Sequence, residues 1–457
     1  MAREKRVIEM TTGSLWKNIL LFSLPLMLTQ VLEVLFNLSD VAIAGKFADY
    51  RALGAVGSTT LLVSLFTGLL IGIGSGVNVA VAHGLGLRDG EQVEKTVHTS
   101  FLICAAAGII LLLICNLLAR PMLALLNTKP ELLDKATLYM QIYFCGMPAL
   151  ALYNFGNAVY SAIGNTKKPL YYLLFSGIVN VVLNLVFVIV CDLDVAGVAL
   201  ASIISQYLSA IFLTAALFRS REIYGLSPKL LRLHRKNCRE ILTLGIPSGL
   251  QNAIFYIANM FIQAGVNSFD TVMVAGNSAA ANSDALVYDV MNAFYMACSS
   301  FISQNMGAKK KKRMLQSYFI SLAYSFGVGL LLGGGLFFFG RTFLALFTTE
   351  SAVIDAGMKR VGVMGFAYCI SAFMDCTIAA SRGLGKTVVP TVIVVLGSCV
   401  FRVIWVYTIF AHFHTIPSLY LLYPCSWTLT AIAEIVYFIH AYKDSMKIFT
   451  QPQPAEV

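Results

Sequence analysis

The sequence predicts an all-α integral membrane protein in which twelve transmembrane helices form two pseudo-symmetric six-helix lobes around a central cleft. Three observations support this fold class. Of the 457 residues, 58% are hydrophobic and only 12% are charged, about half the charged fraction of a typical soluble chain. Apolar segments recur along the whole chain, and the second half repeats the first. Together these features indicate a polytopic membrane protein.

Apolar segments recur along the chain, and each is long enough to cross a hydrocarbon layer of about 30 Å. We expect helices at about 15–45, 52–82, 96–119, 133–162, 169–191, 195–218, 239–267, 272–304, 315–340, 352–380, 388–410 and 417–441. The first segment has no small-residue cleavage site, so we expect it to be retained. The ten cysteines are scattered without a CxxC pair, which predicts small hydrophobic residues rather than metal ligands.

The basic residues predict the orientation of these helices. With the N-terminus in the cytoplasm, 24 of the 33 Lys and Arg fall on inner flanks and loops, including "MAREKR" and "KKKKR" at 309–313. This positive-inside bias predicts that both termini are cytoplasmic. The net charge of +10 is therefore a topology signal. Anionic membrane lipid, and not nucleic acid, is its expected contact.

An internal repeat divides the chain. Pro25 matches Pro247 at an offset of 222, and Pro169 matches Pro390 at an offset of 221. Each half holds six segments, so the halves share one orientation, as in parallel transporter repeats. We expect an N-terminal lobe at 1–218, a cytoplasmic linker at 219–238 and a C-terminal lobe at 239–457. Two such lobes across a central cavity suit a carrier that opens alternately to each side.

A polar stripe interrupts the first segment, "TQVLEVLFNLSDVAIAG". At 100° per residue, Gln30, Glu33, Asn37 and Asp40 fall within about 80° around the helix. Asp40 is the strongest candidate, because a charge inside the hydrocarbon costs on the order of 2.5–3.5 kcal/mol and needs a partner or a proton. Burial favours its protonated form, and its ionised form is an oxygen ligand for a cation. The alternative is a polar residue near the outer end that contacts water.

Further polar residues could converge on Asp40. Asn180 and Asn184 lie four residues apart, on one helix face, about 16 and 22 Å into the membrane from Pro169. Ser202 lies about 10 Å from Val195 at the outer side by the same rise. The alternative is that the two amides only bond to neighbouring helices.

The order of several motifs resembles the multidrug and toxic compound extrusion (MATE) family of bacterial efflux transporters. These motifs are "LPLMLTQVLEVLFNLSDVAIAG", "YSAIGNTKKP", "GIVNVVLNLVFV", "DVAGVALASIISQ", "ILTLGIPSGLQ", "SQNMGAKK" and "AASRGLGKTVVP". The resemblance covers nearly the whole chain. It implies two six-helix lobes, a V-shaped cleft, and antiport that exports amphipathic, cationic small molecules against an inward flux of protons or sodium ions.

The resemblance also bears on single residues. Family members place an Asp where Asp40 stands, in "SDxxxAG". Proton-coupled relatives often carry Asp at the position of Asn184, so a single-carboxylate site is expected here, with a possible sodium ion at Asp40 and Asn180. We expect no cofactor besides the coupling ion, a monomer, and a multi-pass protein of a bacterial plasma membrane.

The expected substrate cleft draws on both halves. Gln30, Glu33 and Asn37 would form its wall in the first lobe; Glu33 could instead be paired with Arg402 or another helix. In the second lobe we expect Asp284, Tyr288 and Asp375. The tyrosine could contact a flat cation or pack in the core.

Other function classes fit less well. The chain has no Walker A loop, no HExxH and no GxSxG motif, so neither an ATP-driven pump nor an enzyme is expected. A flippase for lipid-linked saccharides would share the lobe plan but favour basic residues in the cleft. Within the apolar segments we count six acidic residues and one basic residue, Arg402. This excess of acidic residues favours a cation-handling protein. The six are Glu33, Asp40, Asp284, Asp289, Asp375 and Glu434.

Overall fold

The computed structural model describes residues 7–47, 50–126, 128–345 and 348–449. All regular secondary structure in these ranges is helical. Helices satisfy every backbone hydrogen bond within one segment, which a hydrocarbon environment requires. Eleven of the described helical stretches are long and apolar enough to cross a membrane. The chain is therefore a multi-pass membrane protein, as predicted.

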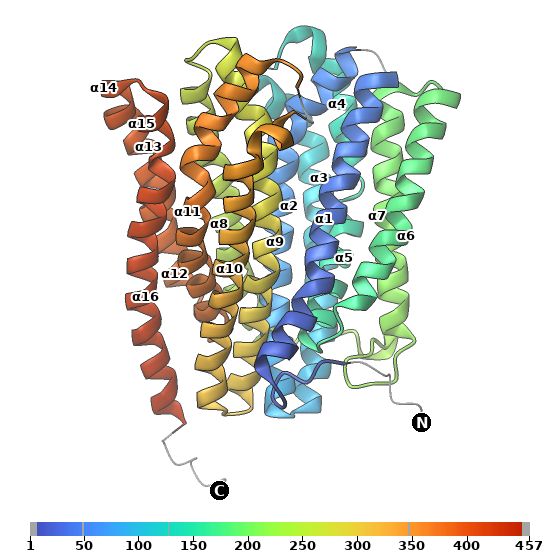
Figure 1. Ribbon diagram of the computed structural model, residues 1–457. Coiled ribbons are helices and arrows are strands. Elements are labelled where there is room, and N and C mark those ends of the chain that lie inside the picture. The colour runs from blue at the N-terminus through green and yellow to red at the C-terminus, as the bar shows by residue number, and fades with distance from the viewer. Residues whose placement is uncertain (1–6, 48–49, 127, 346–347, 450–457) are drawn as a thin grey trace, which may run out of the picture. The chain divides into compact units, whose positions relative to one another are not determined.

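The helices follow the predicted segments closely (Figure 1). The long ones are α1 Leu15–Phe47, α2 Tyr50–Leu87, α3 Gly90–Leu125, α4 Pro130–Phe144, α5 Met147–Ala162, α6 Lys167–Leu185, α7 Asp194–Phe218, α8 Arg235–Val266, α9 Thr271–Gly307, α10 Lys311–Leu344, α11 Ser351–Gly383 and α16 Leu422–Ile448. The eleventh predicted segment consists of α12 Val388–Val394, η3 Val395–Val400, α13 Phe401–Trp405, η4 Val406–Phe410 and α14 Ala411–Phe413. Shorter elements are η1 Val186–Val190, η2 Pro228–Leu230 and α15 Ile416–Tyr420.

The fourth predicted segment, 133–162, is the exception. It forms two helices, α4 and α5, separated at Cys145 and Gly146. Pro148 follows in the first turn of α5. Because proline has no N–H group, it is favoured in the first turn of a helix, where that group would have no partner within the helix. The segment therefore restarts there.

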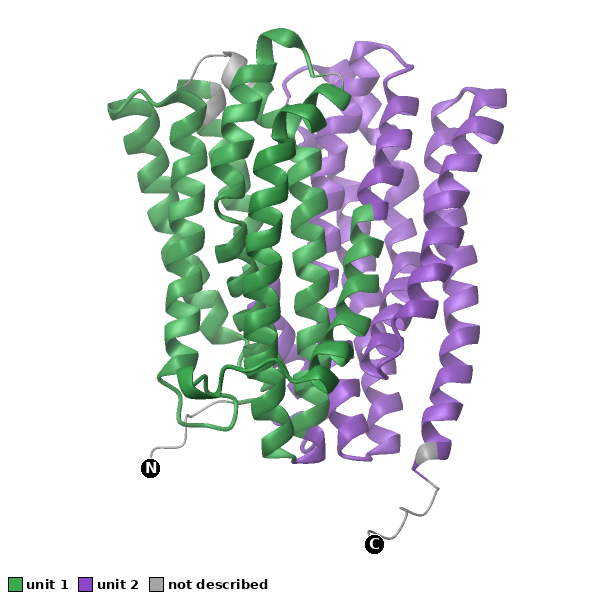
Figure 2. Cartoon of the chain, turned by 180° about the vertical axis from the view of Figure 1, so that it is seen from behind, with its two compact units in different colours: residues 1–8, 28–85, 89–253 green, residues 9–27, 86–88, 254–457 purple. Residues whose placement is uncertain are grey.

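The chain forms two compact units (Figure 2). Unit 1 comprises residues 1–8, 28–85 and 89–253, and unit 2 comprises 9–27, 86–88 and 254–457. Helix α1 thus changes units after Met27, and α8 after Ala253. Each helix has an internal proline shortly before that point, Pro25 and Pro247. The predicted lobe boundaries assigned all of α1 to the first lobe and all of α8 to the second.

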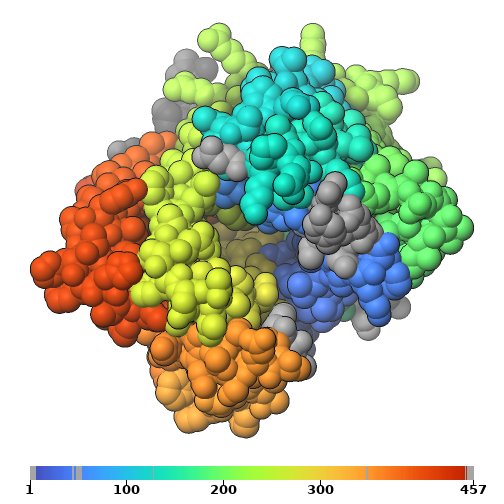
Figure 3. Space-filling model, turned by 90° about the horizontal axis from the view of Figure 1, so that it is seen from above, coloured from blue at the N-terminus to red at the C-terminus, as the bar shows by residue number. Residues whose placement is uncertain are grey.

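Each unit has its own hydrophobic core. In unit 1, α3 packs against α4 and α5, and α7 packs against α4, α5 and α6. Seen from above, the α4 residues (cyan) lie next to the green residues of α6 and α7 (Figure 3). In unit 2, α11 is central and packs against α9, α10 and α16. The start of α1 and the end of α16 lie at the same end of unit 2 (Figure 1).

Small residues allow close helix approach within unit 1. A Cβ atom at Gly72 of α2 would lie 2.1 Å from the backbone nitrogen of Gly249 in α8, and one at Gly76 would lie 2.7 Å from that of Gly245. The glycine-rich run "GIGSGV" at 72–77 thus serves close helix packing through small residues.

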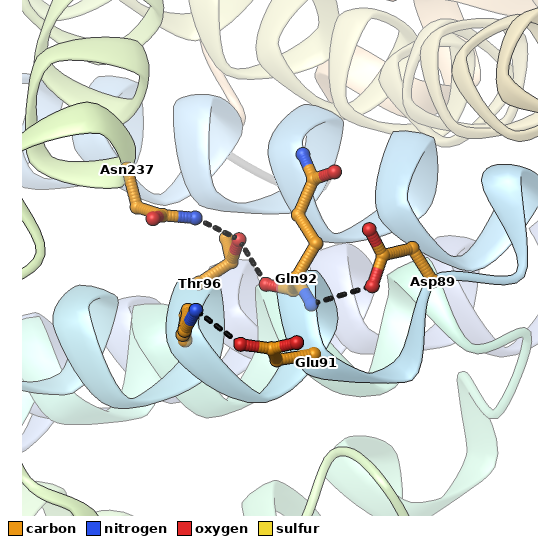
Figure 4. A network of polar contacts seen from close by, with 6 residues as sticks. Asp89, Glu91, Gln92, Thr96 and Asn237 are labelled. Carbon is orange, nitrogen blue, oxygen red and sulfur yellow. Dashed lines mark hydrogen bonds and ion pairs between the residues drawn. The ribbon is translucent and has the colours of Figure 1, made fainter. Parts of the chain in front are cut away.

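The segment that precedes α8 is attached to α3 in unit 1. Thr99 Oγ1 donates to the carbonyl of Arg232 at 3.2 Å, and the amide of His234 donates to Thr99 Oγ1 at 3.2 Å. Asn237 Nδ2 donates to Thr96 Oγ1 at 2.7 Å (Figure 4). A cavity of about 500 Å³ opens beside this network, lined by Asp89, Glu91, Gln92, Lys95, Arg232, Leu233, His234, Arg235, Lys236 and Asn237. It contains none of the predicted site residues.

We predict that Gly72→Ala lowers the melting temperature of the purified protein, because the new methyl group would overlap the α8 backbone. The matched control is Gly57→Ala in the same helix, where an added Cβ meets no atom within 4 Å. That change removes a glycine from a helix and should stabilise it by up to about 1 kcal/mol. Equal melting temperatures for the two variants would contradict the close approach.

We predict that Asn237→Ala destabilises unit 1 by about 1–3 kcal/mol, because Asn237 is 6% exposed and its amide holds α8 to α3. Thermal unfolding in detergent measures the effect. Lys236→Ala is the control, because Lys236 is the exposed neighbour of Asn237 in the same turn of α8. A change no larger than that of the control would show that the contact is not stabilising.

Candidate functional site

The polar residues predicted to converge on Asp40 lie together in unit 1. Asp40 is in the part of α1 that belongs to this unit. Asn184 Nδ2, from α6, donates to Asp40 Oδ1 at 2.5 Å, and Ser202 Oγ, from α7, contacts Asp40 Oδ2 at 2.9 Å. Asn180 joins the group through its Oδ1, which accepts from Asn184 Nδ2 at 3.3 Å. Four side chains from three helices thus form one polar cluster.

The helices bring these groups together for local reasons. Asn180 and Asn184 lie on one face of α6 and are 4% and 0% exposed. The α6 and α7 helices pack against each other, which directs Ser202 toward the same face. At the start of α7, Lys135 of α4 forms an ion pair with Asp194 at 2.6 Å. A π-helical turn, η1, begins two residues after Asn184, and such turns often occur near functional sites.

The hydroxyl of Ser202 has more acceptors than protons. Its Oγ lies 2.9 Å from Asp40 Oδ2 and 3.0 Å from the carbonyl oxygen of Val198. A hydroxyl has one proton to donate. With Asp40 ionised, Ser202 satisfies either the carboxylate or the carbonyl. With Asp40 protonated, the carboxyl donates to Ser202 and Ser202 donates to Val198, so both contacts are satisfied. A cation bound to Asp40 and to the lone pairs of Ser202 would have the same effect.

Asn184 also has an unused acceptor. Its Oδ1 is buried and has no hydrogen-bond partner among the described residues. Hard cations bind carboxylate, amide and hydroxyl oxygens, and all three types are present in this cluster. No group of three or more His, Cys, Asp or Glu side chains gathers elsewhere in the described part of the chain. The residues therefore fit a proton or a hard monovalent cation better than a transition metal.

No described side chain forms an ion pair with Asp40. The carboxyl is contacted by neutral side chains, the donors Asn184 and Ser202 and the amide of Asn180 beside them. Two residues that sequence reasoning did not identify border the cluster electrostatically, Tyr139 and Tyr143 of α4. Gln206 of α7 donates to the Tyr143 hydroxyl at 3.3 Å. These tyrosines lie in the fourth predicted segment, 133–162. Nothing in its sequence indicates which side it presents to α1.

The hydrogen bonds to the Asp40 carboxyl described above do not involve the rest of the predicted stripe. Gln30 and Glu33 are half-buried in α1 and Asn37 is exposed. Glu33 acts electrostatically on Tyr143 and Tyr153 of unit 1. The role of these three residues in a substrate cleft stays a prediction.

In unit 2, Asp284 belongs to a buried ion pair. Its Oδ2 lies 2.7 Å from Nε of Arg360, which is 7% exposed, and it also accepts from the hydroxyl of Tyr368. Arg360 donates further to Asn277 Oδ1 at 2.6 Å. The sequence-based count of Arg402 as the sole basic residue within the apolar segments was therefore wrong. Arg360 lies in α11 and is neutralised by Asp284, so the excess of acidic residues is smaller than expected.

Tyr288 and Asp375 do contact each other. The hydroxyl of Tyr288 in α9 donates to Asp375 Oδ2 in α11 at 2.9 Å. Tyr288 also contacts Trp427, with ring centroids 6.1 Å apart. The guanidinium of Arg402 lies over the ring of Tyr423 at 4.8 Å and donates to Ser426 at 3.2 Å. This packed arrangement favours the core-packing alternative for Tyr288, and a cleft role stays a prediction.

The comparisons with known proteins agree with the fold and the repeat. The MatE family model matches residues 25–186 and 247–408. Both the first and the last residues of the two matches differ by 222, which is the offset found in the sequence. The internal repeat is therefore confirmed.

Two relatives and one solved structure illustrate the similarity. The chain is 25% identical over 363 residues to the "Probable multidrug resistance protein YpnP" of Bacillus subtilis, covering 79% of this chain and 81% of that one. It is 26% identical over 339 residues to the "FAD transporter" of Shewanella oneidensis, covering 73% and 74%. Its fold matches a multidrug resistance MATE family transporter in the outward-facing conformation with a TM-score of 0.90, at 20% identity, covering 97% and 100%.

The family model covers well over half of the chain and matches each half separately. Curated relatives over most of the length are multidrug resistance and export proteins. The chain belongs to the MatE family of multidrug efflux transporters.

Proposed function

We propose that the chain is a secondary active antiporter that exports amphipathic, cationic small molecules by alternating access against an inward flux of protons or sodium ions. The observation that carries this proposal is the Asp40 cluster. It is a carboxyl contacted only by neutral donors, and its ionised form leaves one contact of Ser202 unsatisfied. A bound proton or cation would satisfy this remaining contact. A group of this kind supplies the coupling site that an ion-driven exporter requires.

The cluster can couple two binding events through its protonation or cation occupancy. An ion shifts a conformational equilibrium only by its difference in affinity for the two states. Asp40 is in α1, whereas Asn184 and Ser202 are in α6 and α7. Any movement of α1 relative to α6 and α7 changes these contacts and therefore the ion affinity. The ion would bind where the three helices meet and be released where they separate.

We propose a monomer in the bacterial plasma membrane with both termini cytoplasmic. The start of α1 and the end of α16 lie at one end of unit 2, together with the basic run at 309–313 (Figure 1). Positive charge of this kind is typical of cytoplasmic loops. The family and the relatives named multidrug resistance and export proteins favour small-molecule efflux over the flippase alternative.

We predict that Asp40→Asn abolishes gradient-driven transport. Purified protein in liposomes would be tested for ethidium transport under separately imposed proton and sodium gradients. Flavin adenine dinucleotide is included as an anionic substrate, because one relative is named an FAD transporter. Asp134→Asn is the control, because this exposed carboxylate of unit 1 is paired with Arg120 at the protein surface. The gradient that drives wild-type transport identifies the coupling ion. Full coupling in Asp40→Asn would remove the proposed role of Asp40.

We predict that Ser202→Ala weakens binding of a sodium ion about 10–100-fold, because one of its oxygen ligands beside Asp40, worth about 1–3 kcal/mol, is lost. Ser205→Ala is the matched control on the same helix, since Ser205 donates only to the carbonyl of Ser202 at 2.8 Å. The measurement is transport rate against ion concentration. Identical curves for both variants would show that Ser202 does not contribute to ion binding.

A further inference from the structure

One more buried carboxyl in unit 2, that of Glu434, takes part in none of the contacts described above. Glu434 of α16 is 0% exposed, and both of its carboxyl oxygens are buried without a hydrogen-bond partner among the described residues. An isolated ionised carboxylate in such a site would cost several kcal/mol. Buried polar groups in native proteins are normally paired, so this one requires an explanation.

The neighbouring turns of α16 show why Glu434 has no partner. Ser426, Thr430 and Glu434 are spaced by four residues, on one face of α16. Ser426 accepts from Arg402, and Thr430 contacts Ser398 at 2.9 Å. The same spacing on the facing helical stretch leads from Arg402 and Ser398 to Val394. The two contacts, Ser426 with Arg402 and Thr430 with Ser398, form a ladder between the two helices. By the same spacing its third position brings the Glu434 carboxyl opposite Val394, an apolar and fully buried side chain.

One guanidinium is within electrostatic range of Glu434. Arg382 of α11 acts on it, as does the more distant carboxyl of Asp375. The α16 helix packs against α11, α12, η3, α13 and α15. The other titratable or charged groups on the turns of α16 around Glu434 are Tyr437 and His440, and those on the facing elements include Cys376, Cys399 and Arg402, with Tyr318 of α10 beyond Phe438. Arg382 is thus the cation on α11 that an ionised Glu434 could reach.

We propose that Glu434 is a proton-binding carboxyl of unit 2: it is protonated in this conformation, and its ionised form pairs with Arg382. A metal cation fits less well, because it would need several oxygen ligands. The apolar side chain of Val394 offers none, and the positive charge of Arg382 would repel the cation. A proton needs no further ligand. In the ionised state the Glu434 side chain of α16 would move toward the Arg382 side chain of α11. Proton release would therefore draw these two helices together near Glu434.

This site is independent of the Asp40 cluster. The residue 222 positions before Glu434 is Phe212, and the residue 222 positions after Asp40 is Ile262. The two halves of the chain therefore do not place a carboxyl at equivalent positions. Unit 2 would bind its proton through a residue that the repeat does not share, and the inference stands whether or not Asp40 couples transport.

The test is a pH titration of the whole protein in lipid nanodiscs by difference infrared spectroscopy, which detects the carbonyl stretch of protonated carboxyl groups. We expect part of the wild-type band to be lost at alkaline pH and to be missing from Glu434→Gln. Asp355→Asn is the control and should leave the band unchanged, because Asp355 is exposed and paired with Arg341. A band of wild-type size in Glu434→Gln would overturn the proposal.

A second variant tests the pairing and does not require Glu434 to be replaced. In Arg382→Gln the ionised carboxylate loses its partner, so Glu434 should keep its proton to a pH higher by about one unit or more. An unchanged titration would overturn the pairing with Arg382. Thermal unfolding gives an independent readout. Glu434→Gln mimics the protonated form, so its melting temperature should match the wild type at acidic pH and not fall as the pH rises. A melting temperature below wild type at every pH would show that the ionised form is the native one.

Discussion

The cost of burying charge in a membrane-spanning protein governs the chemistry of this molecule. Four of the carboxyl groups within its helical units are neutralised in different ways. Asp284 forms an ion pair with Arg360, and Asp375 accepts a hydrogen bond from a tyrosine. Asp40 is contacted by an amide and a hydroxyl, and Glu434 has no partner among the described residues. The less complete the neutralisation, the more a group gains from binding a proton or cation. This order separates structural carboxyls from candidate coupling groups.

The two units share one helical plan but differ in chemistry. The MatE model matches both halves at the same offset, and each half includes a π-helical turn in a corresponding helix, η1 and η4. Yet Ile262 stands where the repeat of Asp40 would be, and Arg402 stands 222 residues after Asn180. Helix packing constrains size and apolar character, and it leaves single polar positions free to diverge. The repeat therefore preserved the scaffold while the ionisable groups changed.

The connection between the units is itself a consequence of the repeat. Helices α1 and α8 each begin in one unit and end in the other, and each carries a proline before the change. A proline removes one backbone hydrogen bond and favours a bend. Asp40 lies beyond this point in α1, in the part that packs in unit 1. Conformational change in α1 would therefore alter the contacts of Asp40 directly, which links ion binding to helix geometry.

The sequence alone determined the number, length and order of the membrane helices, the repeat, and the group of residues around Asp40. These follow from local apolar runs, from spacing along one helix, and from depth counted at a fixed rise per residue. The tertiary structure decided which helix faces meet. It paired Asp284 with Arg360, 76 residues away in the chain, and left both carboxyl oxygens of Glu434 without a hydrogen-bond partner among the described residues. Rotation of each helix about its axis depends on side-chain packing with helices distant in sequence. No local pattern encodes that packing, so the neutralisation of each buried charge became visible only in the folded units.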